Sequence, residues 1–231
     1  MATRYSPRIV TDGLVWAIDA ASPRCYDGSG SVTDLVAGAE GNTALDVNST
    51  PGVGDVTRFG GCWDFDGSDD RISFGDLAAA SFGTGDFSAE IVFENDYLSS
   101  WRSLMGKGAS GGTGWSITCN GNILHMDIDA PDNTHFTIQS ITAGLIYHLV
   151  AVWDRSGNAI AYVNGQQKLS TDLTGQPDSV NTANNFALGS YLGGTSWDLN
   201  GRIYLARLYN KALTAAEATQ NFRAVKGRFG L

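Results

Sequence analysis

Four aspartates crowd into the stretch GGCWDFDGSDDRISFG, residues 60–75. Carboxylates this close together can hold a metal ion, catalyse hydrolysis or stabilise a turn. Alternate residues of a strand share one face, so the two aspartates of WDFD point away from its two aromatic rings. The DGSDD segment then predicts a turn in which Asp66 and Asp69 accept backbone N–H groups. Calcium held by Asp66 and Asp69 is the alternative, because Ca²⁺ prefers oxygen ligands. Catalysis is the third and least favoured interpretation, and no other cofactor is expected.

Aromatic side chains beside polar groups form the second kind of candidate, because a sugar ring stacks on an aromatic face while polar side chains bond its hydroxyls. The segment LGGTSWDLNG places Trp197 and Asp198 in an expected loop, with Tyr191 just before it. These three residues are the predicted carbohydrate-binding site, although a core position for Trp197 stays open. Trp101 is a further candidate. Trp115 lies in a strand-like run and is expected in the core.

A second acidic run, HMDIDAPDNTHF, places Asp127 and Asp129 on one strand face, with Asn133 four residues further on. It resembles the metal loop of legume-type lectins, but the further aspartate of that loop is missing. The favoured interpretation is a solvated strand end that leads into a turn. The three histidines of the chain lie in strand-like runs, so we expect strand histidines rather than catalytic bases.

Composition restricts the partners of the chain. It has 15 Lys and Arg against 24 Asp and Glu, a formal charge of −9, and no basic cluster before its last ten residues. Binding to phosphates needs a basic patch, so no nucleic-acid partner is expected. The most apolar run, LIYHLVAVW, is too short to span a membrane, and no run of signal-peptide length opens the chain. Cys25, Cys62 and Cys119 match no zinc signature and are expected as buried thiols.

The elements that must position these residues are mostly short strands. Segments rich in β-branched and aromatic residues recur along the chain between Gly, Asn or Asp, beginning with LVWAID at 14–19. Both alternating faces of LIYHLVAVW are apolar, which is typical of a strand in the middle of a packed sheet. Asn164-Gly165 predicts a two-residue type I′ hairpin turn.

One helix is predicted at residues 214–226. Thr214 and Glu217 have the spacing of a capping box, and Gly227 is placed to end the helix. The apolar face is predicted to consist of Ala218, Phe222 and Val225. Many strands followed by a single helix indicate an all-β, antiparallel sandwich.

Four segments resemble, in order, the laminin-G-like, concanavalin A-like jelly-roll family. They are DGLVWAIDA near the start, the FDGSDD turn, the AYVNG hairpin and the closing RLYNKALTAAE segment. The resemblance implies one jelly-roll domain over residues 14–231, preceded by an N-terminal arm at 1–13. The opening and closing segments especially resemble versions found in virion proteins of tailed bacteriophages.

Glucanases on this fold use two carboxylates, about 5 to 5.5 Å apart in retaining enzymes, on one strand with a Glu-x-Asp-x-(x)-Glu pattern. The nearest match is EIVFENDYLSS, which has Glu90 and Glu94 but Val92 between them. Asp96 follows Glu94 without a closing Glu. We therefore expect no catalytic residues and no enzymatic activity.

Two functions from different classes remain. The first is a structural virion protein of a tailed phage, a capsid decoration, cement or fibre subunit, located in the virion. Its expected partners are the major capsid protein and further copies of itself. The second is a lectin-like module that binds cell-surface glycans, and the two functions can coincide. The predicted attachment arm carries Arg4, Tyr5 and Arg8, since Arg and Tyr are enriched at interfaces.

Overall fold

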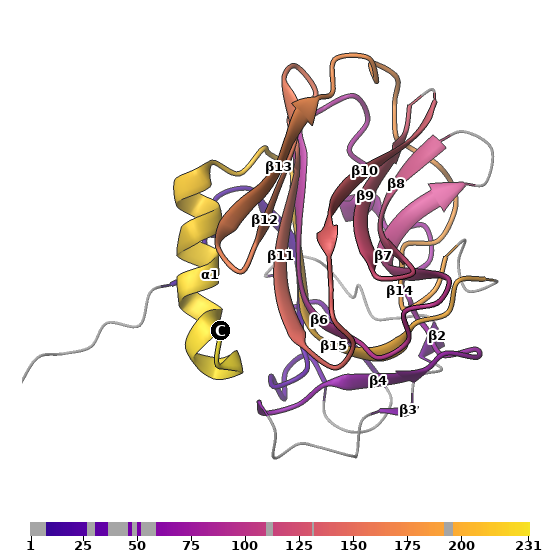
Figure 1. Ribbon diagram of the computed structural model, residues 1–231, viewed down its shortest axis with the longest axis vertical. Helices are drawn as coiled ribbons and strands as arrows, with labels where there is room; N and C mark the ends of the chain where they lie inside the picture. Colours follow the sequence, from indigo (N-terminus) through magenta and orange to yellow (C-terminus); the bar gives the residue numbers. More distant parts are fainter. Residues whose placement is uncertain are drawn as a thin grey trace, which may run out of the picture.

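The chain folds as two antiparallel sheets packed face to face, with one helix against the outside of the first sheet (Figure 1). The computed structural model describes residues 8–26, 31–36, 46–47, 50–51, 59–109, 113–130, 132–191 and 196–231. The all-β jelly-roll sandwich expected from the strand pattern is confirmed.

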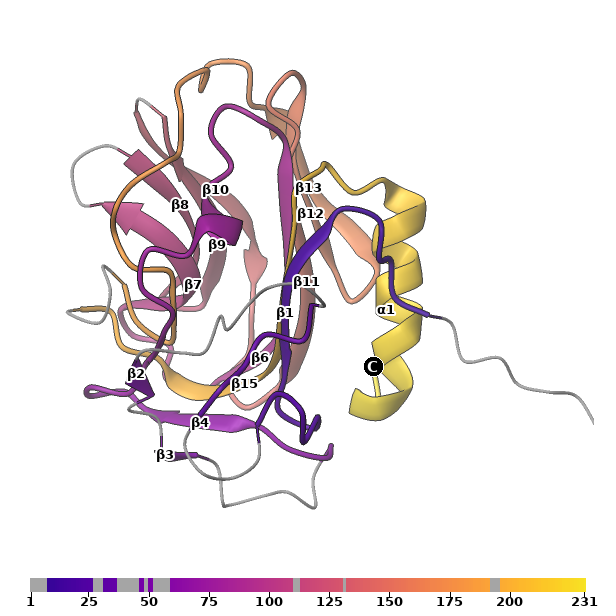
Figure 2. The ribbon, with the colours of Figure 1, turned by 180° about the vertical axis from the view of Figure 1, so that it is seen from behind.

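The first sheet has the strand order β13-β12-β11-β6-β15-β4-β3, and β1 also pairs with β15. Its strands are β1 (Leu14–Asp19), β3 (Thr50–Pro51), β4 (Trp63–Asp66), β6 (Phe87–Asn95), β11 (Ile146–Trp153), β12 (Asn158–Val163), β13 (Gln166–Asp172) and β15 (Asn200–Tyr209). Strand β11 lies between β6 and β12, and both of its faces are apolar because one joins the core between the sheets and the other packs beneath α1. Figure 2 shows β1 from behind, beside β15, so the two ends of the domain meet in this sheet.

The second sheet has the order β10-β9-β8-β7-β14-β5-β2. Its strands are β2 (Asp46–Val47), β5 (Ile72–Ser73), β7 (Trp101–Ala109), β8 (Thr113–Asn120), β9 (Ile123–Asp129), β10 (Asn133–Ser140) and β14 (Ala187–Leu188), and a short 3-10 turn covers Ala78–Ala80. Alternate residues of β8 and β9 divide between the two faces. Trp115, Ile117, Met126 and Ile128 join the core, and the polar residues between them face outward.

The main core fills the space between the sheets. Trp16 packs edge-on against Phe74 and Phe186, with ring centroids 5.1 and 4.9 Å away. Trp115 is 1% exposed and its indole N–H donates to the carbonyl of Ala80, so its predicted core position is confirmed. All three cysteines are buried and none forms a disulfide.

The hairpin turn at Asn164-Gly165 joins β12 to β13 as predicted. Both residues have positive φ, 49° and 75°, which is the signature of a type I′ turn. A side chain at position 165 would also meet the ring of Phe222, which lies across the turn.

Helix α1 (Ala215–Phe229) begins at the predicted capping box. The Thr214 hydroxyl accepts from the Glu217 N–H, and the Glu217 carboxylate accepts from the Thr214 N–H. The predicted end was wrong: Gly227 lies inside the helix, and Gly230 caps it in the left-handed conformation at φ 71°. The additional turn allows Arg228 to pair with Asp19 at 2.8 Å.

The buried stripe of α1 also differs from the predicted apolar face. It consists of Ala218, Asn221, Val225 and Phe229, whereas Phe222 is only half-buried. The reason is a polar group beneath the helix. Asn221 donates to Glu90 (2.8 Å) and to the Tyr209 hydroxyl (2.9 Å), and accepts from the Val10 N–H (2.8 Å). The face of α1 that carries Asn221 is turned toward the sheet, because the buried amide satisfies the hydrogen bonds of these three partners.

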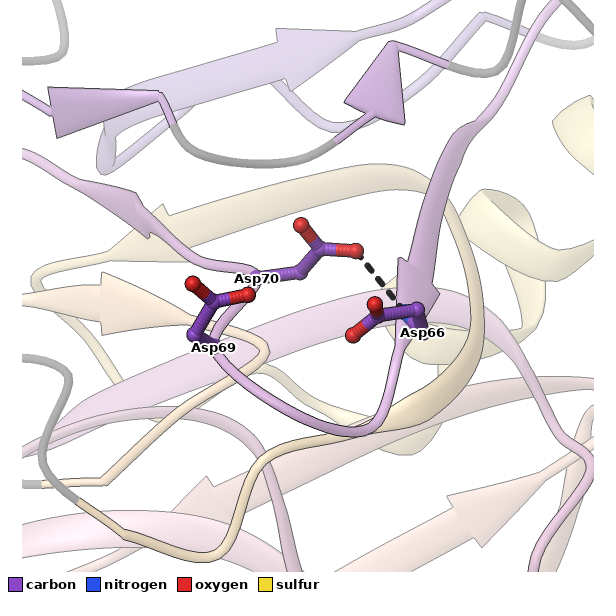
Figure 3. A group of neighbouring side chains, drawn as sticks. All are labelled: Asp66, Asp69 and Asp70. Atoms are coloured by element: carbon purple, nitrogen blue, oxygen red, sulfur yellow. Dashed lines mark hydrogen bonds between the residues drawn. The ribbon is translucent and has the colours of Figure 1, made fainter.

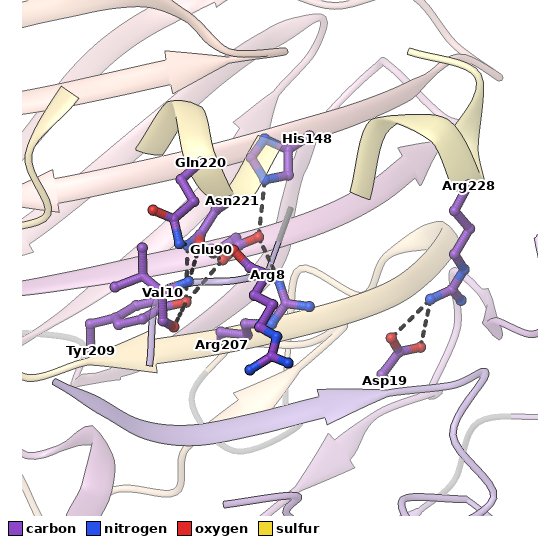
Figure 4. A network of polar contacts seen from close by, with 10 residues as sticks. All are labelled: Arg8, Val10, Asp19, Glu90, His148, Arg207, Tyr209, Gln220, Asn221 and Arg228. Atoms are coloured by element: carbon purple, nitrogen blue, oxygen red, sulfur yellow. Dashed lines mark hydrogen bonds and ion pairs between the residues drawn. The ribbon is translucent and has the colours of Figure 1, made fainter. Parts of the chain in front are cut away.

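Glu90 is the centre of that polar network (Figure 4). Its carboxylate is fully buried and bonds Arg207 at 2.6 Å and His148 at 3.0 Å. Burial alone would raise the pKa of Glu90, but Arg207, His148 and Tyr209 outweigh it and hold the pKa below its ordinary value. The network therefore contains a charged carboxylate under α1, which its ring of donors stabilises.

Candidate functional site

Three aromatic rings, one from β7 and two from the loop between β14 and β15, gather on the outer side of the second sheet. Trp197 stacks on Tyr191 with centroids 4.3 Å apart and on Trp101 with centroids 5.1 Å apart. The interplanar angles are 23° and 20°, so the Trp197 ring is stacked against both of the other rings. Trp101 and Trp197 are half-buried and Tyr191 is 9% exposed. We call these three residues the aromatic cluster.

Local hydrogen bonds hold the aromatic cluster in place. The loop from β14 to β15 is closed by Tyr191 N–H to the Ser196 carbonyl (2.8 Å), and Ser103 N–H donates to the Trp197 carbonyl (2.8 Å). The ring of Tyr191 rests on Gly108 of β7, where a Cβ would lie 3.0 Å from the ring. Glycine at this position is what lets the ring approach the strand.

Trp197 has an unusual backbone conformation. Its φ is 59°, in the left-handed region, which is a rare outlier for a bulky residue and costs on the order of 1–3 kcal/mol. Such strain persists only where the surroundings enforce it and gathers at functional sites. At this position it aims the indole at Tyr191 and Trp101.

A carboxylate and an imidazole lie next to the aromatic cluster. Asp127 of β9 accepts from Ser116 (3.0 Å) and Thr118 (2.7 Å) with one oxygen and contacts His135 Nδ1 at 2.7 Å with the other. The bond to Asp127 raises the pKa of His135, although partial burial opposes the shift. The ring of His135 also lies 5.0 Å from that of Trp101, which joins this polar group to the rings.

Asp129 and His125 flank Asp127 on the same face of β9. Asp129 is 6% exposed, and its Oδ1 has no hydrogen-bond partner among the described residues. Burial first, and then the charge of Asp127, raise the pKa of Asp129 to about 6. Burial lowers the pKa of His125, against the pull of Asp127, so the His125 ring is neutral near pH 7.

A notch of about 10 Å³ opens between the acidic residues and the aromatic cluster, lined by Asp127, Asp129, Asn133, His135, Tyr191 and Trp197 among others. This volume is close to that of one water molecule. The notch is therefore too small for a sugar ring but admits one hydroxyl group. A hydroxyl-sized polar notch therefore lies beside half-buried aromatic rings.

The predicted sugar site is partly assembled. Tyr191 and Trp197 meet as described, and Trp101 joins them. Asp198 lies beside Trp197, but its carboxylate accepts from the Ser190 hydroxyl at 2.8 Å and so helps to close the loop. The carboxylates at the notch come instead from Asp127 and Asp129.

The expectation that Asp127 and Asp129 form a solvated strand end was wrong, because both residues are at least nine-tenths buried. Sequence reasoning also missed His125 and His135 as members of the site. The signal that could have found them is their alternation with the core residues of their strands. That alternation puts them on the face that carries Asp127.

The Asp66 turn is a second, separate acidic group (Figure 3). The Asx-type turn is confirmed at Asp66, which accepts from Ser68 N–H at 2.8 Å. Asp70 also accepts a backbone bond, from the Asp66 N–H at 2.8 Å. Carboxylate oxygens of Asp66, Asp69 and Asp70 lie within 4.8 Å of one another. Calcium at Asp66 and Asp69 stays a prediction, with Asp70 as a third ligand.

Comparison with known proteins identifies the superfamily of the chain. The model of the concanavalin A-like lectin/glucanases superfamily matches residues 66–219, more than half of the chain. The chain belongs to this superfamily. No curated protein matches it.

Solved structures agree with this jelly roll at low sequence identity. The botulinum neurotoxin serotype G binding domain superposes with a TM-score of 0.65 at 16% identity, covering 90% of this chain and 50% of that one. The binding domain of Paraclostridial Mosquitocidal Protein 1 gives 0.66 at 14%, covering 91% and 52%. The Ruminococcus gnavus IT-sialidase CBM40 bound to α2,3-sialyllactose gives 0.53 at 12%, covering 68% and 95%. The chain thus spans about half the length of the two toxin domains.

The glucanase-like carboxylates of this superfamily member lie away from the notch. Val92, between Glu90 and Glu94, packs in the cluster that contains Val225 and Phe229 of α1, so this face of β6 is covered by the helix. Glu94 is 4% exposed and bonds Arg202 and the Tyr204 hydroxyl, each at 2.9 Å.

The predicted attachment arm falls largely outside the described residues, since Arg4 and Tyr5 are not among them. Arg8 is exposed, and its carbonyl accepts from the Gln220 side chain at 2.8 Å. Val10 continues this contact through Asn221 and Tyr209. No helix within the described ranges is long and apolar enough to cross a membrane.

Proposed function

We propose that the chain is a lectin-like, non-enzymatic module that binds glycans at the aromatic cluster and the notch. A sugar ring packs against the exposed parts of the half-buried Trp101 and Trp197 rings, and one of its hydroxyls enters the notch and donates to Asp129. The observation that carries the proposal is Asp129 Oδ1, a buried acceptor beside half-buried aromatic rings, with no partner among the described residues. Buried acceptors are nearly always bonded.

The absence of catalysis is part of the proposal. Glu90 is fully buried and Glu94 nearly so, with both carboxylates engaged on the face covered by α1. At the notch, Asp127 is held by two hydroxyls and an imidazole.

Sugar-binding neighbours support the choice of ligand. One similar structure is a carbohydrate-binding module bound to sialyllactose. Another is of botulinum neurotoxin type C, whose cell entry depends on interaction with two ganglioside molecules.

A printed glycan array tests the binding site. Wild-type protein is compared with Trp197→Ala and Asp129→Ala, which remove the indole ring and the acceptor. The matched control is Phe222→Ala, which removes a half-buried ring from α1 on the outside of the other sheet. We expect binding by the wild type and the control, and at least a tenfold loss in both site variants. Equal binding by all four folded proteins would place the site elsewhere.

We propose further that this module is a structural virion protein of a tailed bacteriophage, a capsid decoration, cement or fibre subunit. The opening and closing segments support this role, because they resemble phage virion proteins and lie side by side. Strand β1 pairs with β15, and Asp12 bonds Lys211 at 2.5 Å. The proposed partners are the major capsid protein and other copies of the chain.

Co-purification with virions tests this second proposal. A variant lacking residues 1–7 keeps Arg8 and Val10, which contact α1, and should stay folded by circular dichroism. We expect weaker attachment to particles and a smaller oligomer by light scattering, and Arg4→Ser with Tyr5→Ser should repeat the effect. Particle binding and oligomer mass equal to wild type in both variants would exclude the arm as the attachment point.

A further inference from the structure

We infer that the notch selects uncharged glycans and excludes those with a terminal anionic sugar, and that Asp129 is the residue that determines this specificity. The inference rests on the proposed glycan-binding function. It would set this chain apart from the similar module bound to sialyllactose.

The charges around the notch are unequally compensated. Asp127 and Asp129 are two residues apart on one face of β9, which separates them by about 6.6 Å along the strand. Asp127 bonds His135 and two hydroxyl groups. Asp129 Oδ1 has no partner in the part of the chain that is described. A ligand that enters the notch therefore meets a buried acceptor to which none of the described residues donates.

Other groups near the notch do not supply a cation to Asp129. The described residues that line the notch include no Lys or Arg, and His135 is already paired with Asp127. His125 is neutral because burial lowers its pKa. Burial first, and then Asp129 and Asp127, raise the pKa of Tyr191 to about 12, so its hydroxyl carries no charge either. With a pKa of about 6, Asp129 is mostly ionised near pH 7, so two carboxylates against one imidazole leave the notch with a negative net charge.

The size of the notch and its charge both disfavour an anionic sugar. A notch of about 10 Å³ receives a hydroxyl, which can donate to Asp129, but a carboxylate is larger and has no proton to donate. Like charges also repel more strongly where burial lowers the local dielectric constant. A chain of net charge −9 adds a long-range repulsion of the same sign.

The test uses an array of neutral glycans, each printed beside the same glycan with a terminal sialic or uronic acid. Wild-type protein at low salt should bind its strongest neutral glycans at least tenfold more tightly than their anionic counterparts. Asp129→Asn should narrow this ratio at least threefold. The matched control is Asp132→Asn, which removes an exposed charge from the neighbouring turn and should leave the ratio unchanged. Added salt should narrow the wild-type ratio through better binding of the anionic glycans.

The outcomes separate the inference from the function on which it rests. Strong wild-type binding to anionic glycans, equal to or tighter than to the neutral partners, would overturn the inference and leave glycan binding intact. An Asp129→Asn protein that folds and keeps the wild-type ratio would overturn the assignment to Asp129. An array with no bound glycan of either kind would overturn the proposed function, and the inference with it.

Discussion

At the scale of single residues, two positions combine a structural cost with a place in the candidate site. Trp197 holds its ring through a left-handed backbone, and Asp129 buries an acceptor without a described partner. Costs of this kind are common at functional sites, where activity needs a strained or destabilised arrangement. Both costs can be measured without knowledge of the ligand.

Glycine at position 197 should give a more stable protein than alanine. The left-handed conformation costs a non-glycine residue about 1–2 kcal/mol, whereas glycine adopts it freely. We therefore expect Trp197→Gly to exceed Trp197→Ala by about 1 kcal/mol in the free energy of unfolding, measured by urea denaturation. Both variants lack the ring and should lose glycan binding equally. A less stable glycine variant would mean that the loop relaxes when the indole is removed.

Asn at position 129 should stabilise the protein near neutral pH. The pKa of Asp129 rises from 3.8 to about 6 on folding, so the folded state holds its proton more tightly than the unfolded chain. Its contribution to stability is therefore greatest below pH 4 and is lost as the pH rises from 4 through 6. Asp129→Asn should raise the urea midpoint at pH 7.5 and have little effect at pH 4. Asp132→Asn is the control. Equal midpoints of wild type and Asp129→Asn at pH 7.5 would contradict the burial cost.

At the scale of elements, helix α1 and the hairpins show two different ways of fixing a segment. The capping box and the type I′ turn satisfy local groups within a few residues. The orientation of α1 depends on partners far away in sequence, because Asn221 meets Glu90 on β6 and Val10 near the N-terminus. The helix thus fastens the opening segment to the sheet.

Asn221→Leu should destabilise the domain although it adds apolar volume. The change leaves Glu90 and Tyr209 without the amide donor and Val10 N–H without an acceptor, and each unsatisfied buried group costs about 1–3 kcal/mol. Gln220→Leu, at the exposed neighbouring position, should change the free energy of unfolding by less than about 0.5 kcal/mol. Chemical denaturation of both variants measures the difference. Equal effects would mean that water replaces the amide.

At the scale of the whole molecule, the two outer faces of the sandwich differ in what packs on them. Helix α1 covers the first sheet over Glu90, and Figure 1 shows the second sheet on the opposite side of the core. The notch and the aromatic cluster lie on the outer face of the second sheet, on which no helix of the described residues packs.

No polysaccharide should be cleaved by this molecule. Glu90 and Glu94 are engaged beneath or beside α1, and the notch holds a single hydroxyl. We expect no release of reducing sugar from laminarin, agarose or alginate above a heat-treated control. Release that disappears in Asp129→Asn would instead identify the notch as a catalytic centre, and release that disappears in Glu94→Gln would identify β6.

The sequence by itself determined the jelly-roll class, the hairpin at Asn164-Gly165 and the start of α1, because strand alternation, turn residues and caps depend on neighbours in the chain. It also indicated Tyr191 and Trp197 by their loop composition.

Only the tertiary structure decided which groups meet in the site. Trp101 reaches Trp197 from a strand nearly a hundred residues away. Asp129 is buried because a loop and a neighbouring strand cover it. Asn221 replaced Phe222 in the buried stripe because Glu90 lies opposite. Burial and charge at these positions are set by what packs across them, and a pattern along one strand or helix carries no information about the element on the other side.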